Sequence, residues 1–336
     1  MKIAIIRLSA LGDIIQSSIV LQFIKKAHPQ AQIDWFVDER FCEILKAHPL
    51  IDRLFALPLK DRRVFAVLKM LVSARKRHYD AVIDLQGLLK SAVVARIICA
   101  NTYGFDNDSL KESAASLFYR HRLALKYSEN IILRNVALMN FALNLSVGAA
   151  QILAKAPCFA PQKAALAKIK GKIQLAKRNI LVHTGSSAAN KNYPKERVAI
   201  LCAMLLSRYK DAKIWLCWGS EGEKKFAKFV AKDVAKASIA PTPRLNLQEL
   251  IALTSLCDLV IGNDSGPTHL AFAMNKPSIT IFGATPSYRN AYQTPINKVI
   301  DSGKFISDTK HIDKGDFCIQ NIDEKRIFTL AKGLLK

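Results

Sequence analysis

The chain has 336 residues, of which half are apolar and 23% are charged, a composition that predicts a folded protein with a large core and excludes a disordered or collagen-like chain. Lysine and arginine number 50 against 27 acidic residues, so the formal net charge is +23. Such an excess of positive charge predicts a polyanionic neighbour: nucleic acid, an anionic membrane or a phosphorylated substrate.

Neither a membrane anchor nor a secretory signal is expected. No apolar run approaches the roughly 18–20 residues that cross a bilayer, and Arg7 interrupts the short apolar amino terminus. The seven cysteines are odd in number, widely scattered and include no Cys-x-x-Cys pair. These features predict a reduced, cytoplasmic protein without a disulfide framework or a structural zinc site.

The first half of the chain alternates apolar strands with amphipathic helices. It opens with a strand over Ile3–Leu8, a tight turn at Gly12 and Asp13, and a helical pattern over 14–27 that Pro29 ends. The elements that follow are a strand over Ile33–Val37, a helix near 41–47, a strand over Arg53–Leu57, a basic helix from Arg62, a strand over Asp80–Leu85 and a helix from Gly87 through Cys99.

The second half repeats this rhythm after a segment, 154–179, that is rich in lysine and alanine and has no strand pattern. Alternating strands and helices predict an α/β protein with two doubly wound, Rossmann-like domains, whose parallel sheets face each other across a cleft. The predicted domains are 1–160 and 175–318, and we expect 319–336 to form a C-terminal helix that packs back on the first domain. Strands of the second half are expected at 179–184, 213–218, 258–262 and 278–282.

Several common nucleotide-binding and hydrolase motifs are absent from the sequence. No two glycines lie two positions apart, so Gly-x-Gly-x-x-Gly is missing and an NAD-dependent dehydrogenase is disfavoured. The P-loop motif, His-Glu-x-x-His and Gly-x-Ser-x-Gly are also missing, which disfavours a P-loop kinase, a zinc protease and a serine hydrolase. The chain must therefore handle its substrate with other residues.

Asp13 follows the first predicted strand at the start of a helix, which is the end of a sheet where α/β proteins bind ligands. This position suits a general base within reach of an acceptor hydroxyl. It suits equally well an aspartate that only caps the helix. The position alone leaves both interpretations open.

Three strand ends of the second half carry residues suited to a nucleotide diphosphate. In GNDSGPTHLA (262–271), small and hydroxyl residues open a helix whose N–H groups can bind phosphate. HTGSS (183–187) is followed by Lys191, whose ammonium can neutralise a leaving phosphate, and WGSEGE (218–223) places a carboxylate where ribose hydroxyls can donate to it. The simpler alternative for each segment is a capped turn or a polar loop. Three such loops opposite Asp13 are typical of a GT-B glycosyltransferase.

Five segments resemble the heptosyltransferases, a family of GT-B glycosyltransferases. They are SALGDIIQS, VIDLQGLLKSA, GFDNDSLKESAASLFY, WGSEGE and GNDSGPTHLA, and the similarity runs from the first strand to about Phe282. The resemblance implies an inverting transfer of L-glycero-D-manno-heptose from ADP-heptose, without a metal or another cofactor. SALGD and ASLFY favour the family member that adds the first heptose, to the inner Kdo of Kdo2-lipid A. The alternative is the member that adds the second heptose.

The resemblance also implies roles for individual residues. Asp13 matches the general base, and Lys191 matches a lysine near the phosphates and the sugar. Glu223 matches the ribose ligand, Asp264 the residue that holds the heptose, and Leu245 an apolar residue that packs on adenine. The remaining donor-binding candidates are Ser186, Ser187, Ser265, Gly266, Thr268 and His269.

Residues 58–77 combine seven basic side chains with one acidic and several apolar ones. The pattern predicts a helix that binds an anionic membrane surface, or else an ordinary surface helix whose apolar face lies on the sheet. Because Kdo carboxylates and lipid A phosphates need cationic partners, the resemblance favours acceptor contacts in this half of the chain. The acceptor candidates are Ser9, Gly12, Lys60, Arg62, Arg63, Lys90, Lys111, Arg120 and Arg134.

These interpretations together predict a monomeric enzyme at the cytoplasmic face of the inner membrane. Its expected partners are ADP-heptose, Kdo2-lipid A and anionic lipid, and not nucleic acid. The alternative to an enzyme is a non-catalytic basic protein that binds a membrane or nucleic acid. The sequence contains no stacking aromatic cluster, zinc finger or RNP-type motif that would favour nucleic-acid binding.

Overall fold

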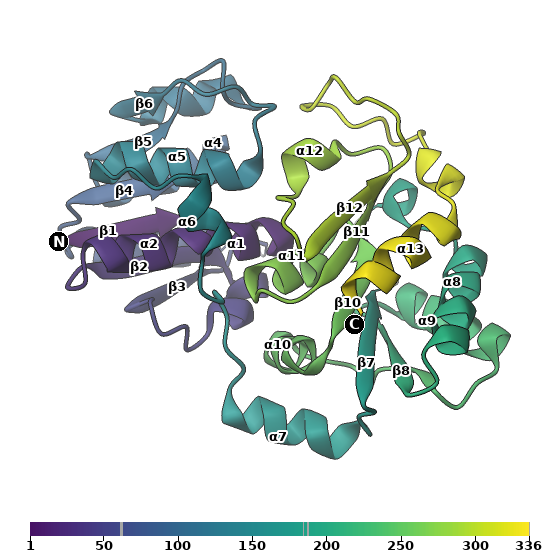
Figure 1. Cartoon of the computed structure of the whole chain (residues 1–336). Helices are drawn as coiled ribbons and strands as arrows, with labels where there is room; N and C mark the ends of the chain where they lie inside the picture. Colours follow the sequence, from purple (N-terminus) through teal and green to yellow (C-terminus); the bar gives the residue numbers. More distant parts are fainter. Residues whose placement is uncertain (61–62, 184, 187, 336) are drawn as a thin grey trace. The chain divides into compact units, whose positions relative to one another are not determined.

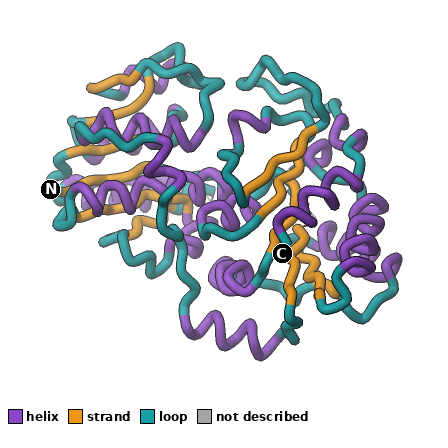
Figure 2. Tube along the Cα trace, viewed as in Figure 1, coloured by secondary structure: helices purple, strands orange, loops and turns teal. Residues whose placement is uncertain are grey.

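The apolar runs of the first half form a six-stranded parallel sheet. In the computed structural model, which describes residues 1–60, 63–183, 185, 186 and 188–335, the chain divides into two units, Met1–Cys158 and Phe159–Lys336. Each unit is a sheet flanked by helices (Figures 1 and 2). The strands of the first unit lie in the order β3-β2-β1-β4-β5-β6. Their bounds are β1 Lys2–Ile6, β2 Gln32–Asp38, β3 Arg53–Leu57, β4 Ala81–Asp84, β5 Thr102–Phe105 and β6 His121–Leu123.

Apolar side chains cover both faces of this sheet. Ala4 and Ile6 of β1 pack with Phe36 of β2 in a core that includes buried residues of α3 and α4, while the intervening Ile3 and Ile5 are also fully buried. Burial of every position is what a parallel strand covered on both faces requires. The helices of this unit are α1 Leu11–Ser17, α2 Ile19–Ala27, α3 Val64–Arg75, α4 Leu89–Ile98, α5 Ile131–Leu143 and α6 Ala149–Leu153, with 3₁₀ turns η1 Glu39–Leu45 and η2 Ser113–Phe118.

The structure divides one predicted helix and changes the type of another. The pattern over 14–27 forms α1 and α2, which meet at Ser18, whose hydroxyl donates to the carbonyl of Ile15 over 2.7 Å. A serine that bonds to its own preceding turn competes with the regular helical ladder. The helix expected near 41–47 is the 3₁₀ segment η1.

The second unit contains another six-stranded parallel sheet, in the order β12-β11-β10-β7-β8-β9. Its strands are β7 Arg178–His183, β8 Ala212–Cys217, β9 Ile239–Pro241, β10 Leu259–Asn263, β11 Ser278–Phe282 and β12 Asn297–Asp301. Its helices are α7 Lys163–Lys172, α8 Lys195–Arg208, α9 Glu221–Val234, α10 Leu247–Leu256, α11 Gly266–Ala273, α12 Ser287–Asn290 and α13 Glu324–Leu334, with 3₁₀ turns η3 Ala189–Lys191 and η4 Cys318–Asn321.

Both sheets have the doubly wound strand order in which the first strand lies at the centre. The chain moves outward from β1 to β3 and then crosses to β4, and it repeats the move from β7 to β9 and β10. The order reverses between β1 and β4 in one unit and between β7 and β10 in the other. Ligands of such sheets bind outside the carboxyl ends of the strands at this reversal.

The domain limits differ from the predicted ones at both ends of the second domain. The first unit ends at Cys158, near the predicted 160, but the second begins at once, because α7 packs on α10 and Lys172 pairs with Glu249 at 2.8 Å. The C-terminal helix α13, expected to return to the first domain, belongs to the second unit and packs on α8, β11 and β12. Its apolar side chains Ile327 and Ala331 are fully buried in the core of that unit.

None of the helices in the described part of the chain is both long enough and apolar enough to span a membrane.

Candidate active site

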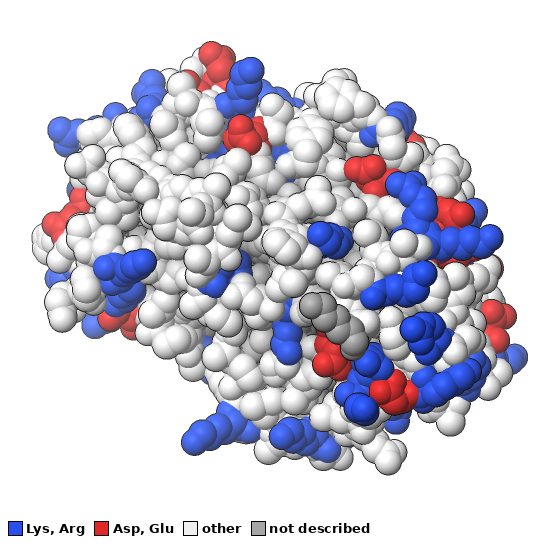
Figure 3. Space-filling model, in the orientation of Figure 1, with Lys and Arg blue, Asp and Glu red and all other residues white. Residues whose placement is uncertain are grey.

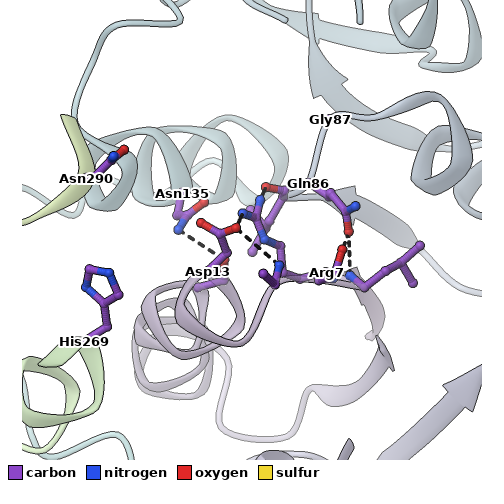
Figure 4. A network of polar contacts seen from close by, with 12 residues as sticks. Arg7, Asp13, Gln86, Gly87, Asn135, His269 and Asn290 are labelled. Carbon is purple, nitrogen blue, oxygen red and sulfur yellow. Dashed lines mark hydrogen bonds and ion pairs between the residues drawn. The ribbon is translucent and has the colours of Figure 1, made fainter. Parts of the chain in front are cut away.

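Asp13 lies in the first turn of α1, just beyond the carboxyl end of β1. Its Oδ2 accepts a hydrogen bond from the backbone N–H of Ala10 at 3.3 Å and forms an ion pair with Arg7 Nη2 at 3.0 Å (Figure 4). The first contact is a cap of the helix start, so the capping interpretation of Asp13 is confirmed for one of its two oxygens. Its side chain is 42% exposed, so the carboxylate remains accessible to a substrate.

The other acceptor candidates of the first unit lie mostly at the surface. Ser9, in the loop before α1, and Gly12, in the first turn of α1, are half-buried, while Lys60, Lys90, Lys111 and Arg120 are exposed. Arg63 is exposed and pairs with Glu39 at 3.1 Å. Arg62 lies outside the described residues.

Arg134 is buried, and its guanidinium bonds to backbone carbonyls of the same unit. Arg134 is only 3% exposed, and its guanidinium donates to the carbonyls of Ser109, Leu125 and Lys126 at 2.6–2.8 Å. It also stacks over the ring of Phe105 at 3.9 Å. Because these bonds hold loop carbonyls that would otherwise be unpaired, this placement argues against the predicted acceptor role of Arg134.

Asp264 is the centre of the polar cluster in the second unit. It follows β10, and its Oδ2 accepts from Lys191 Nζ at 2.6 Å and from the hydroxyl of Thr285 at 3.1 Å. Oδ1 lies 3.1 Å from His269 Nε2, which must carry the proton because a carboxylate only accepts. The structure thus brings three of the predicted donor-site residues together, because Lys191 and His269 both contact Asp264.

Asp264 is buried but charged. Burial by itself would raise the pKa of this carboxyl group, but the hydrogen bond from His269 and the positive charge of Lys191 outweigh that effect and hold the pKa of Asp264 well below its usual range. The carboxylate is therefore ionised at every physiological pH. In turn it fixes the ammonium of Lys191 beside the start of α11.

The start of α11 is shaped by its own hydroxyl groups. Thr268 Oγ1 donates to the carbonyls of Asn263 and Ser265 at 2.9 Å, and Ser265 Oγ donates to Asn263 at 3.1 Å. Pro267 occupies the first turn, where a missing N–H costs nothing. The half-buried Gly266 begins the helix, whose first N–H groups have no partner within the helix and are suited to an anion.

The other donor candidates follow β7 and β8. Glu223 lies in the first turn of α9, and its Oε2 accepts from the backbone N–H of Gly219 at 2.6 Å. A Cβ at Gly185 would meet the carboxylate of Glu223, which would have to move aside, so Gly185 lets Glu223 approach this loop closely. Ser186 Oγ bonds within its own loop, to the carbonyl of Ala188 at 2.8 Å. Ser187 lies outside the described residues, and Leu245 is half-buried in the loop before α10.

Three residues of these clusters were missed by sequence reasoning. Thr285 follows β11, and the rule that polar residues after parallel strands share one edge could have found it. Arg7 was noted only as an interruption of an apolar strand, although a buried arginine needs a counter-ion. Gln86 lies within VIDLQGLLKSA, but no role was assigned to it.

The chain is similar to known proteins along its whole length. The model of the glycosyltransferase family 9 (heptosyltransferase) matches residues 67–308. Lipopolysaccharide heptosyltransferase 1 of Campylobacter coli is 53% identical over 338 residues, which cover 99% of both chains.

Two solved structures have the same fold. A glycosyl transferase family 9 protein from Veillonella parvula matches with a TM-score of 0.82 at 21% identity, over 99% of this chain and 97% of its own. The E. coli heptosyltransferase WaaC with ADP matches with a TM-score of 0.79 at 22% identity, over 99% of both chains. The predicted α/β class of the GT-B type is thereby confirmed. The family match and the full-length identity establish that this chain belongs to glycosyltransferase family 9, the heptosyltransferases.

Proposed function

We propose that the protein transfers L-glycero-D-manno-heptose, with inversion, from ADP-heptose to the inner Kdo of Kdo2-lipid A. The observation that carries this proposal is the 53% identity along the whole chain to a lipopolysaccharide heptosyltransferase 1. The motifs SALGD and ASLFY support the same choice of the first heptose over the second.

The proposed reaction begins at Asp13. Its carboxylate accepts the proton of the acceptor hydroxyl while that oxygen attacks the anomeric carbon from the face opposite the diphosphate. A partly exposed carboxylate at the carboxyl end of β1 supports this role, because a general base must reach the hydroxyl directly.

The leaving diphosphate is stabilised in the second unit. Lys191 brings a positive charge, held by Asp264 at 2.6 Å, and the first N–H groups of α11 add the positive end of a helix dipole. These groups can neutralise the charge that develops on the diphosphate, so we propose that the transfer needs neither a metal ion nor another cofactor. Glu223 and Leu245, which follow β8 and precede α10, are proposed to hold ribose and adenine.

The proposed acceptor and the positive charge both point to an anionic membrane, at the cytoplasmic face of the inner membrane. Lys and Arg side chains outnumber acidic ones on the face seen in Figure 3, and the whole chain has a net charge of +23. We propose that the protein acts there as a monomer, because one chain carries the candidate residues for both substrates. This surface is proposed to bind lipid and not nucleic acid.

The α3 patch supports attachment through a particular helix. We define it as the exposed residues Arg63, Val64, Phe65, Leu68, Lys69, Val72, Arg75 and Lys76. Leu71 and Ala74 of α3 are buried in the core, so the helix keeps one apolar face on the sheet, as one interpretation expected. Phe65 is nevertheless 90% exposed, and apolar side chains interleaved with cations are suited to anionic lipid.

We expect Phe65→Ala to weaken binding to vesicles that contain phosphatidylglycerol by about tenfold, because burying an aromatic side chain in lipid contributes about 1.5–3 kcal/mol. Sedimentation with such vesicles and with neutral phosphatidylcholine vesicles measures the change. Leu117→Ala is the matched control, since Leu117 is 74% exposed in the same unit but lies outside the α3 patch. Equal binding by the two variants would remove α3 from membrane attachment.

The transfer itself is tested by mass. Incubation of the protein with ADP-heptose and Kdo2-lipid A should increase the mass of the acceptor by one heptose. A protein that leaves Kdo2-lipid A unchanged, but adds heptose to an acceptor that already carries one, would be the enzyme of the second step. Failure with both acceptors would refute the proposed function.

A further inference from the structure

Arg7 is a buried cation at the point where the first sheet reverses its strand order. Arg7 follows β1 and is 5% exposed. Its backbone N–H donates to the carbonyl of Phe36 in β2 at 3.2 Å. The indole N–H of Trp35 donates to its carbonyl at 3.3 Å, and its Nη1 donates to the carbonyl of Leu85, just after β4. Both the backbone and the guanidinium of Arg7 are therefore fixed.

The guanidinium of Arg7 approaches the carboxylate of Asp13 at Oδ2. Arg7 Nη2 lies 3.0 Å from Oδ2, and the N–H of Ala10 donates to the same atom at 3.3 Å (Figure 4). Among the described residues, Oδ1 has no hydrogen-bond partner. The two contacts thus restrict the rotation of the carboxylate and leave Oδ1 for a substrate.

Gln86 holds the loop that connects Arg7 with Asp13. Its Oε1 accepts from the N–H groups of Leu8 and Ser9 at 2.7 and 3.2 Å. Gln86 is in turn fixed through its own N–H, which donates to Asp84 Oδ1 at 2.9 Å, and the other oxygen of that fully buried carboxylate accepts from Tyr119 at 2.7 Å. The position of Asp13 is therefore set by β1 and β4 together.

We propose that Arg7 is a positioning residue, which fixes Oδ2 of Asp13 so that Oδ1 receives the acceptor proton. This inference rests on the proposed transfer. In that step the proton of the acceptor hydroxyl moves to Oδ1, and the electron pair of the O–H bond forms the new bond to the anomeric carbon. The bond between that carbon and the diphosphate breaks, and its electron pair leaves with ADP.

The other charged groups at this end of the sheet are engaged elsewhere. Asp38, at the end of β2, pairs with Arg40 at 2.7 Å, and the nearby charge of Lys90 also acts on Asp38. Asp84, at the end of β4, is bonded to Tyr119, and Arg134 of α5 to loop carbonyls. Within the described residues, the charge in contact with Asp13 is that of Arg7.

The test compares the kinetics of Arg7→Met and Arg7→Lys with those of the wild-type protein. We expect Arg7→Met to lower kcat about a hundredfold, because a small displacement of a catalytic group has an effect of that size, and to leave the KM for ADP-heptose unchanged. Arg7→Lys keeps a donor that can contact Oδ2 of Asp13 and should restore most of the rate.

Arg77→Met is the matched control. Arg77 forms a similar ion pair with Asp34 of β2, at the opposite end of the strands, so its loss should lower stability without lowering kcat. If Arg7→Met does not fold, Arg7→Gln carries the same test, because the amide can still donate to Leu85. Wild-type kcat in the neutral variant, while Asp13→Asn is inactive, would overturn the role of Arg7. Absence of transfer by the wild-type protein would instead overturn the proposed function.

Discussion

Asp13→Asn should fold, bind ADP-heptose normally and transfer heptose at least about a hundredfold more slowly than the wild-type protein, since a positioned general base contributes typically 10²–10⁴-fold. The amide oxygen of asparagine can still accept from Arg7 and from the N–H of Ala10, which are the contacts of Oδ2. The substitution therefore keeps the helix cap and removes the ability to take a proton. Turnover at saturating donor and acceptor measures the effect.

The alternative role of Asp13 predicts a different result for the same variant. If the side chain only caps α1, Asp13→Asn should have almost no effect on turnover, because the amide oxygen can accept the same hydrogen bond from the N–H of Ala10. Thermal unfolding with and without ADP separates a folded, inactive variant from a misfolded one. Near-wild-type turnover would return Asp13 to a capping role and direct the search for a base to other carboxylates.

The sequence pattern predicted the strands that contain a continuous apolar run and missed those that do not. β11 has the predicted bounds, Ser278–Phe282, because a buried parallel strand must be continuously apolar, and the edge strand β3 was found through its apolar run over 54–57. β5, β6, β9 and β12 have three to five residues each, and they were not predicted. Polar or turn-forming residues such as Gly104, His121 or Pro241 interrupt these strands and leave no apolar run to detect.

The candidate site shows the same division between local and long-range information. The loops after β7, β8 and β10 were predicted from local pattern, because their polar residues directly follow apolar strands. The contacts of Asp264 with Lys191 and Thr285 join residues 73 and 21 positions apart, and only the strand order brings those together. The burial of Arg134 was not foreseen for a related reason, since its charge is evident in the sequence but its place under a loop is not.

The cluster around Asp264 predicts a variant that loses both stability and activity. Asp264→Ala leaves the ammonium of Lys191 and the N–H of His269 without their acceptor in a buried site. Removing one partner of a buried pair costs about 3–5 kcal/mol, so the melting temperature should fall clearly. Lys191 also loses the contact that holds it, and the loss of one group that stabilises developing charge lowers turnover about a hundredfold.

Thr285→Val is the control for Asp264→Ala, because it removes one hydrogen bond to the same carboxylate and should cost only about 0.5–1.5 kcal/mol. The pH dependence gives an independent check. Since the pKa of Asp264 is lowered in the folded protein, its stabilising contribution is fully present above the ordinary aspartate value of about 3.9 and is lost as the pH falls below it. The difference in the free energy of unfolding between the wild-type protein and Asp264→Ala should therefore stay constant from pH 8 to 5 and shrink in stronger acid. A difference that is small at neutral pH, or that does not shrink in acid, would show that the carboxylate of Asp264 does not hold this cluster together.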